Sequence, residues 1–223
     1  MAHLRKDPIL GDWVIVAPDR ATRPFDAATT NSVSPSELCP FCRGHEEATP
    51  AAVLTLPEGK DSDDWDVRII PNRFPAVVAA TPSTEPQTDG FFEQKRAAGY
   101  HEVIVESPQH HRCMRELGFS QVFRVVRAWR DRLKAVSADQ SVAHTMLFKN
   151  EGALAGASLE HVHSQLLATS FIPSRIEAEL DAAENHASRT GRLLWDDIVD
   201  RELDDDVRLV MANEHFVLLC PFA

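Results

Sequence analysis

The chain has 223 residues, of which 43% are hydrophobic, so it is long enough to bury a core in one large domain or two small ones. Its 34 acidic side chains outnumber the 23 basic ones, and the net charge of −11 excludes nucleic acid and anionic membranes as general partners. The sequence has no membrane-spanning apolar run and no signal peptide at its start. We therefore expect a soluble protein of the cytoplasm.

The first third of the chain predicts short strands separated by irregular segments. Residues 13–17 predict a strand, and the Pro- and Asp-containing segment 18–24 predicts an irregular loop that carries Arg20 and Arg23. Residues 26–50 contain little apolar surface, so something other than packing should hold them. Further along, strands are expected at 67–70 and 101–106, and a polar, mobile loop at 83–90.

The rest of the chain predicts two helices and four more strands. Apolar residues recur at steps of four and three and predict a helix over 120–136 with Ser120 as its N-cap. Its predicted buried face comprises Val122, Val126, Trp129, Leu133 and Val136. The other expected elements are strands at 144–149 and 161–168, a helix at 174–187 that ends before Gly191, and a hairpin of 207–211 with 216–220.

The order of these elements predicts the fold class. Strands are joined by short turns, helices are inserted at intervals, and βαβ alternation is absent, so we expect an α+β fold with a mainly antiparallel sheet and flanking helices. The chain ends just after its last predicted strand, and we expect the natural fold to continue beyond it.

The segment 161–168 carries the most chemistry. Because side chains alternate along a strand, His161, His163 and Gln165 are expected on one face. A neutral imidazole can attack the α-phosphorus of a nucleotide, and the Gln165 amide can hold a phosphoryl oxygen. A polar strip facing solvent is the alternative interpretation of this pattern.

A loop rich in small residues precedes this strand and favours the phosphate interpretation. Asn150, Gly152, Gly156 and Ser158 leave backbone N–H groups accessible to phosphate oxygens. No Walker-type lysine follows, so the loop is not a P-loop.

The cysteine pair Cys39-Pro-Phe-Cys42 has the spacing of a metal site. A tetrahedral zinc ion needs two more ligands, for which His110 and His161 are candidates, and the adjacent His111 keeps the choice of histidine open. Four protein ligands would leave no open position, so the zinc ion would be structural. A redox pair is the competing interpretation, but the thioredoxin-like βαβ unit is not found.

Two further segments carry groups suited to phosphate. Arg20 and Arg23 form a pair that could bind a diphosphate bidentately, and Asn72 and Arg73 lie between two prolines. On spacing alone, solvated loop side chains are the alternative for both segments.

Taken together, the motifs resemble galactose-1-phosphate uridylyltransferase, a family of the histidine triad superfamily. They cover nearly the whole chain in order: Arg20-x-x-Arg23-Pro, Cys39-Pro-Phe-Cys42, Pro71-Asn-Arg-Phe-Pro75, Ser107-Pro-x-His110, Asn150-x-Gly152 with Gly156-x-Ser158, and His161-x-His163-x-Gln165. The resemblance implies a histidine-triad-like catalytic domain with a zinc site over residues 1–206, with residues 207–223 beginning a second half.

The resemblance also implies roles for single residues. His163 would attack the α-phosphate of UDP-glucose, release glucose 1-phosphate and pass UMP to galactose 1-phosphate. It implies zinc ligands at Cys39, Cys42, His110 and His161, phosphate contacts at Arg20, Arg23, Asn150, Gly156, Ser158 and Gln165, a uridine-side contact at Asn72, and a ligand for a second metal, iron or zinc, at Glu179. A homodimer is implied as well.

One departure keeps other functions open. The family usually has proline between the two active histidines, whereas this chain has Val162. An adenylyl-transferring relative that acts on ADP-sugars is therefore an alternative. Because the family's second half would follow this chain, a zinc-stabilised nucleotide-binding module without full transferase activity is another.

Overall fold

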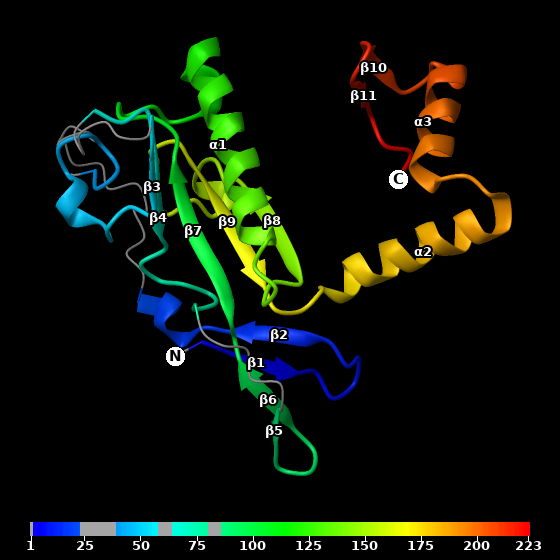
Figure 1. Cartoon of the computed structure of the whole chain (residues 1–223), viewed down its shortest axis with the longest axis horizontal. Helices are drawn as coiled ribbons and strands as arrows, with labels where there is room; N and C mark the ends of the chain where they lie inside the picture. Colours follow the sequence, from blue (N-terminus) through cyan, green and yellow to red (C-terminus); the bar gives the residue numbers. More distant parts are fainter. Residues whose placement is uncertain (1, 23–38, 58–63, 80–85) are drawn as a thin grey trace. The chain divides into compact units, whose positions relative to one another are not determined.

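The computed structural model describes residues 2–22, 39–57, 64–79 and 86–223. The chain divides into two compact units, Met1–Ile172 and Pro173–Ala223, which we describe separately (Figure 1). None of the helices in the described residues is long and apolar enough to span a bilayer.

A five-stranded sheet with the order β3-β4-β7-β9-β8 forms the centre of the first unit (Figure 1). All of its strand pairs are antiparallel. Its strands are β3 (Leu54–Leu56), β4 (Val67–Pro71), β7 (Gly99–Val105), β8 (His144–Phe148) and β9 (His163–Thr169).

The two faces of this sheet are covered by different segments. The helix face packs against α1 (Phe119–Ser137), with Val67, Ile104 and Leu166 fully buried in the core between them. We call the opposite face the loop face, because the buried segment 39–42 packs there with Trp65, Ile70, Val103 and Val105. Alternation along β9 therefore directs Ser164 and Leu166 to the helix face and His163 and Gln165 to the loop face.

Gly99 allows β7 and β9 to approach closely where β7 begins. Its φ angle is +151°, and a Cβ atom placed there would lie 1.9 Å from the carbonyl oxygen of Ala168. Only glycine meets both conditions, so this residue fixes the start of the pairing between the two strands.

A smaller sheet with the order β2-β1-β6-β5 completes the first unit (Figure 1). It has its own core around Leu4 and Val77, to which Leu167 of β9 contributes. Its strands are β1 (His3–Lys6), β2 (Trp13–Val16), β5 (Gln87–Thr88) and β6 (Glu93–Arg96), and short 3-10 helices lie at Pro18–Thr22, Glu46–Ala48, Met114–Glu116 and Ala153–Ala155.

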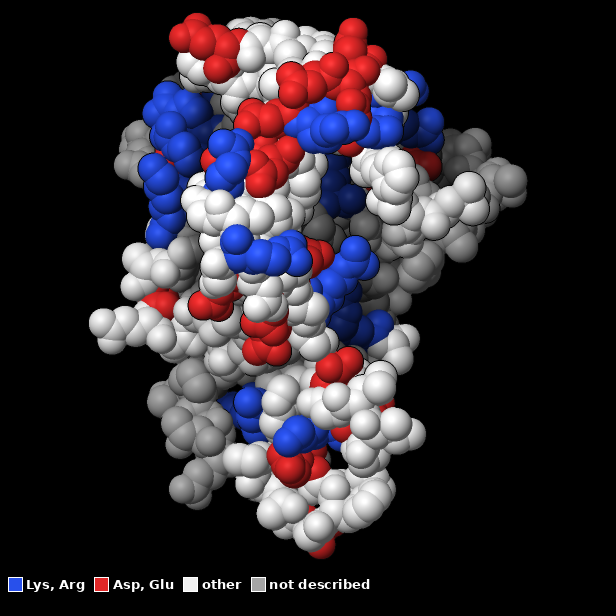
Figure 2. Space-filling view, turned by 90° about the vertical axis from the view of Figure 1, so that its right-hand side faces the viewer, with Lys and Arg blue, Asp and Glu red and all other residues white. Residues whose placement is uncertain are grey.

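The second unit contains two helices and a hairpin. Its elements are α2 (Ser174–Thr190), α3 (Leu194–Asp205), β10 (Leu209–Ala212) and β11 (Val217–Leu219). His186 Nε2 of α2 lies 2.6 Å from Asp197 Oδ2 of α3, and Arg192, between the two helices, pairs with Asp197 and Asp200. Basic and acidic side chains both occur on the face shown in Figure 2.

The structure confirms the fold class expected from the sequence. The sheets are antiparallel, α1 packs on one face of the five-stranded sheet, and the one parallel pairing in the described part of the chain is the isolated bridge between Val78 and Ala98. The expected strands, the helix before Gly191 and the final hairpin are present. Gly191 ends α2 with a φ angle of +73°. The division between the two units falls after residue 172, and the boundary at residue 206 stays a prediction.

Two loop predictions were wrong in part. Pro18–Thr22 forms a 3-10 helix, because the proline fixes one backbone angle and the Arg20 amide donates to the Ala17 carbonyl. In the segment 83–90, residues 83–85 lie outside the described residues, whereas Gln87–Thr88 pairs with β6. Asp89 closes that hairpin by accepting two backbone N–H groups, a contact that carries no hydrophobic signal.

The helix prediction was wrong at its start and on one side chain. The N-cap is Gly118, whose carbonyl accepts the amide of Val122, and Ser120 lies within the first turn. Phe119 at the first position is 86% exposed, so apolar periodicity could not locate the start. Val126 is 47% exposed, because its neighbour Val125 occupies the position that faces the sheet.

Candidate active site

His163 begins β9 on the loop face and is buried, with 6% of its surface exposed. Its Nδ1 lies 2.7 Å from the carbonyl oxygen of His161. A carbonyl only accepts, so Nδ1 carries the proton and the Nε2 lone pair is available to an electrophile. Burial and the nearby Lys149 ammonium lower the pKa of His163, while the bond to the His161 carbonyl raises it. A neutral imidazole with a directed lone pair is the form that acts as a nucleophile.

A buried ion pair holds the backbone of His163. The Lys149 ammonium donates to the His163 carbonyl at 2.9 Å and to Glu106 Oε2 at 2.6 Å. Glu106 is fully buried, and burial raises the pKa of its carboxyl while Lys149 lowers it. On the helix face, Trp129 Nε1 donates to Ser164 Oγ at 2.8 Å. Trp129 of α1 and Lys149, which directly follows β8, thus hold the start of β9 in place.

Gln165 lies on the same face as His163 and is held through its side-chain oxygen. His101 Nε2 lies 2.9 Å from Gln165 Oε1, and Asn72 Nδ2 donates to the same oxygen at 3.2 Å. Arg20 is attached to the adjacent backbone, donating from Nη1 to the Phe74 carbonyl at 2.8 Å. The structure therefore connects Arg20, Asn72 and Gln165, which lie far apart in sequence.

Four potential metal ligands meet on the loop face: Cys39, Cys42, His110 and His161. Their ligand atoms all lie within 4.8 Å of one another. The distance between Cys39 Sγ and His161 Nδ1 is 3.5 Å, Cys42 Sγ and His110 Nδ1 are also 3.5 Å apart, and Cys42 Sγ and His161 Nδ1 are 3.6 Å apart. Ideal tetrahedral zinc bonds to nitrogen and sulfur imply an edge of about 3.6 Å. The cluster therefore has the dimensions of a tetrahedral metal site.

The surroundings of this cluster also suit a metal ion. His161 Nε2 donates to the Ser107 carbonyl at 2.9 Å, which leaves Nδ1 as the ligand atom. Burial raises the pKa of Cys39 to about 12 and lowers the pKa of His161 to about 4. A buried thiol of this kind ionises when a cation binds it, and a neutral imidazole is ready to coordinate.

The loop between β8 and β9 carries the other phosphate-binding candidates. It begins two residues after Phe148, which pairs with Gln165 across the sheet. Gly152 and Gly156 have φ angles of +81° and +79°. Asn150 and Ser158 are half-buried and make no side-chain hydrogen bond to another described residue. These groups are placed beside the strand that carries His163 and Gln165.

Of the other predicted residues, one lies outside the described residues, one is exposed and one belongs to the second unit. Arg23 lies outside the described residues. Arg73 is exposed, and no hydrogen bond or ion pair links it to the site within the described part of the chain. Glu179 belongs to the second unit, where it pairs with Arg175 at 3.3 Å and stays half-exposed. His161 also lies just before β9 rather than within it, because the ladder with β7 begins at His163.

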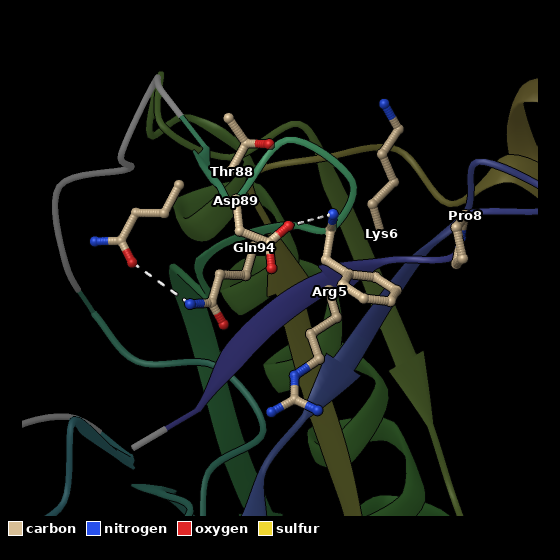
Figure 3. A pocket seen from close by; sticks show the side chains of 8 residues that line it. Arg5, Lys6, Pro8, Thr88, Asp89 and Gln94 are labelled. Carbon is tan, nitrogen blue, oxygen red and sulfur yellow. Dashed lines mark hydrogen bonds between the residues drawn. The ribbon is translucent and has the colours of Figure 1, made fainter.

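An open cavity of about 650 Å³ lies on the small sheet (Figure 3). Its lining comprises Arg5, Lys6, Pro8, Gln87, Thr88, Asp89, Phe92 and Gln94. Lys6 pairs with Glu93 at 3.2 Å, and Asp89 accepts backbone N–H groups of its own turn. The charged groups therefore have local partners, and none of the described lining residues is a predicted site residue.

Three contributors to the site were not identified from the sequence. Phe41 packs edge-on against His163 and His161, with ring centroids 5.4 Å and 5.9 Å apart. Lys149 supports the backbone of His163, and His101 supports the side chain of Gln165. Alternation along residues 101–106 could have indicated His101, since it shares the loop face with the buried Val103 and Val105.

Comparisons with known proteins identify the family of the chain. The family model described as galactose-1-phosphate uridyl transferase, N-terminal domain, matches residues 1–173. ADP-glucose phosphorylase from Arabidopsis thaliana is 31% identical over 99% of this chain, and galactose-1-phosphate uridylyltransferase from Haemophilus influenzae is 28% identical over 99%. The chain spans about 62% of the length of each relative.

Solved structures show the same two kinds of relative. A uridylyltransferase structure superposes with a TM-score of 0.74 at 30% identity and covers 100% of this chain and 62% of its own. The ADP-glucose phosphorylase from Arabidopsis thaliana, with bound ADP-glucose, gives a TM-score of 0.67 at 27% identity and covers 100% and 64%. The resemblance indicated by the motifs is confirmed, and the chain belongs to the galactose-1-phosphate uridyl transferase family through that family's N-terminal domain.

Proposed function

We propose that this chain carries the nucleotidyl-transfer site of an enzyme that moves UMP from UDP-glucose to galactose 1-phosphate. The observation that carries the proposal is the His163 imidazole, whose Nδ1–H is bound to the His161 carbonyl so that Nε2 faces away as the nucleophilic atom. Family membership over residues 1–173 supports the same chemistry.

The reaction would proceed by two displacements at the α-phosphorus. In the first, His163 Nε2 forms a bond to phosphorus, the bond to the bridging oxygen breaks, and glucose 1-phosphate leaves with the bonding electron pair. In the second, a phosphate oxygen of galactose 1-phosphate attacks the same phosphorus, and the imidazole is released. The Gln165 amide and the N–H groups of the loop that contains Gly152 and Gly156 would bind the phosphoryl oxygens.

Zinc is the metal that best suits the four-residue cluster. Cys39, Cys42, His110 and His161 would hold it with no open coordination position, so it would stabilise the fold and take no part in the reaction. It would hold the segment that carries Phe41 against His163. Metal binding would thus help to keep the His163 side chain in position.

Other parts of the proposal rest on family resemblance. Arg20 and Arg23 would contact phosphate, Asn72 the uridine side, and Glu179 a second metal, iron or zinc. Arg20 donates to the Phe74 carbonyl, and Asn72 donates to the Gln165 side chain. Both contacts are compatible with residues that line the substrate site. The enzyme would act as a homodimer in the cytoplasm, on a nucleotide sugar and a sugar 1-phosphate.

A second candidate differs in the nucleotide. Val162 replaces the proline usual between the two histidines, and a relative 31% identical over nearly the whole chain is an ADP-glucose phosphorylase. The same histidine chemistry would then move AMP from an ADP-sugar. A module that binds nucleotides without transferring them is the third alternative.

Label exchange separates transfer from binding. A covalent transferase moves label from glucose 1-phosphate into UDP-glucose without any second acceptor, and ADP-glucose tests the second candidate in parallel. We expect exchange with the wild-type chain, none with His163→Gly, and unchanged exchange with His111→Asn, a control outside the metal cluster. Ligand-dependent stabilisation without exchange in the wild type would indicate a binding module and contradict the proposal.

A further inference from the structure

We propose that His101 is a positioning residue that fixes which end of the Gln165 side-chain amide faces the reacting phosphate. His101 lies on β7 and is buried, with 6% of its surface exposed. The inference deepens the proposed function and rests on it, because it names a group that acts on the reaction through Gln165. Four hydrogen bonds carry the argument.

The backbone determines the tautomer of His101. The Ala76 N–H group donates to His101 Nδ1 at 2.9 Å, so Nδ1 must be the unprotonated nitrogen of a neutral ring. The proton therefore lies on Nε2, 2.9 Å from Gln165 Oε1. His101 is a donor toward Gln165.

The backbone determines the orientation of Asn72 in the same way. The Phe74 N–H group donates to Asn72 Oδ1 at 2.9 Å, so the other end of this side chain is its NH2 group. That group lies 3.2 Å from Gln165 Oε1 and 3.2 Å from His101 Nε2. Asn72 Nδ2 and His101 Nε2 are therefore two donors that share Gln165 Oε1 as their acceptor, and the contact between them is not a hydrogen bond.

Two donors aimed at one atom fix the Gln165 amide. Only its oxygen can accept both hydrogen bonds, so the Gln165 NH2 group must point the other way. This NH2 group makes no hydrogen bond to another described residue. With the reverse orientation, an amide oxygen would face the phosphate and repel it. His101 thus makes Gln165 a donor to an anion.

The sheet makes this arrangement rigid. His101 pairs with Leu167 and Val103 pairs with Gln165 in the β7–β9 ladder, so His101 lies diagonally opposite Gln165 on the loop face. Side chains on paired central strands hold geometry better than side chains on loops. The donor is therefore oriented before substrate binds, which is the condition for effective electrostatic stabilisation.

Two substitutions separate positioning from packing. His101→Phe keeps an aromatic ring and removes both nitrogen contacts. His101→Gln keeps a donor that can reach Gln165 Oε1, so it should restore what His101→Phe loses. Zinc content and the free energy of unfolding are measured in both variants to establish that the cluster and the fold persist.

Nuclear magnetic resonance tests the geometry without any reaction. In the wild-type chain, long-range proton–nitrogen correlations should show neutral His101 protonated on Nε2; protonation on Nδ1 would overturn the inference. The Gln165 NH2 group should be rigid in the wild type and in His101→Gln and mobile in His101→Phe. An equally rigid group in a folded His101→Phe protein would also overturn it.

Kinetics then tests the consequence. His101→Phe should slow formation of the nucleotidyl adduct by about 10- to 100-fold, whereas His101→Gln should stay within about threefold of wild type. In a Gln165→Ala background, His101→Phe should cause no further loss. A wild-type rate in His101→Phe would overturn the inference. If the wild-type chain forms no adduct, the proposed function fails, and the resonance measurements still decide the role of His101.

Discussion

The two sheets of the first unit differ in the burial of their polar side chains. In the five-stranded sheet, His101, His163 and Gln165 are buried, and each has a partner that fixes its orientation. In the four-stranded sheet, β5 is exposed and Leu4 is the one buried residue of β1, β5 and β6, although the open cavity lies there. Burial without a partner costs free energy, so an oriented buried group indicates function more strongly than an empty volume does.

The same contrast applies to two ion pairs between lysine and glutamate. Lys149 and Glu106 are 2.6 Å apart, with the Glu106 side chain fully buried and Lys149 19% exposed. Lys6 and Glu93 are 3.2 Å apart and are 38% and 35% exposed. Water and salt screen the second pair, whereas removing one member of the first leaves a buried charge.

The largest expected effect comes from the candidate metal cluster on the loop face. Cys39→Ser removes one of four ligands, and we expect it to lower the free energy of unfolding by on the order of 5 kcal/mol, because metal binding contributes folding energy. Denaturant titration and metal analysis measure both effects. Cys113→Ser is the matched control, since Cys113 lies outside the cluster. An undiminished metal content in Cys39→Ser would contradict the assignment.

The next effect compares the two ion pairs. Lys149→Met should lower the free energy of unfolding by about 3 to 5 kcal/mol, whereas Lys6→Met should lower it by less than about 1 kcal/mol. Equal losses would show that burial does not distinguish the two sheets. Denaturant titration of both variants under the same conditions provides the comparison.

The pH dependence of the free energy of unfolding sharpens this test. Burial raises the pKa of Glu106, and without the Lys149 ammonium the pKa should rise further. A carboxyl whose pKa is raised on folding favours the folded state at low pH and loses that contribution as the pH rises through the folded-state pKa. The deficit of Lys149→Met should therefore shrink as the pH falls from neutrality. A deficit that grows at lower pH would contradict the sign.

The smallest effect is expected in the cavity of the small sheet. Arg5 lines this cavity, and its Nε contacts His3 Nε2 at 3.0 Å in an exposed position. Arg5→Ala should change the rate of label exchange by less than about twofold, as is usual for an exposed side chain away from the chemistry. A tenfold loss would show that the cavity contributes to the reaction and would remove the distinction between the sheets.

The sequence predicted the elements whose signal is hydrophobic or chemical. Short strand segments rich in apolar residues indicated β4, β7 and β9, and the spacing of ligands together with the family resemblance indicated all four members of the candidate metal cluster. These signals are local or rest on several motifs in a fixed order. They required no knowledge of which strands are neighbours.

The sequence could not predict features that depend on polar strands or distant contacts. β1 and β6 contain mostly charged or polar residues, so no apolar alternation marks them. The contact between His101 and Gln165 joins residues 64 positions apart and depends on the pairing of β7 with β9. The contact of Arg20 with the Phe74 carbonyl depends on a fold in which these loops meet.

The central claim is that His163 becomes covalently nucleotidylated, and intact-mass spectrometry tests it most directly. The protein is mixed with UDP-glucose and, separately, with ADP-glucose. We expect a gain of one UMP in the wild-type chain and no gain in His163→Gly that retains its metal; a gain of AMP would assign the adenylyl function instead. No gain with either nucleotide sugar in a metal-containing protein, or an adduct that persists in His163→Gly, would contradict the account.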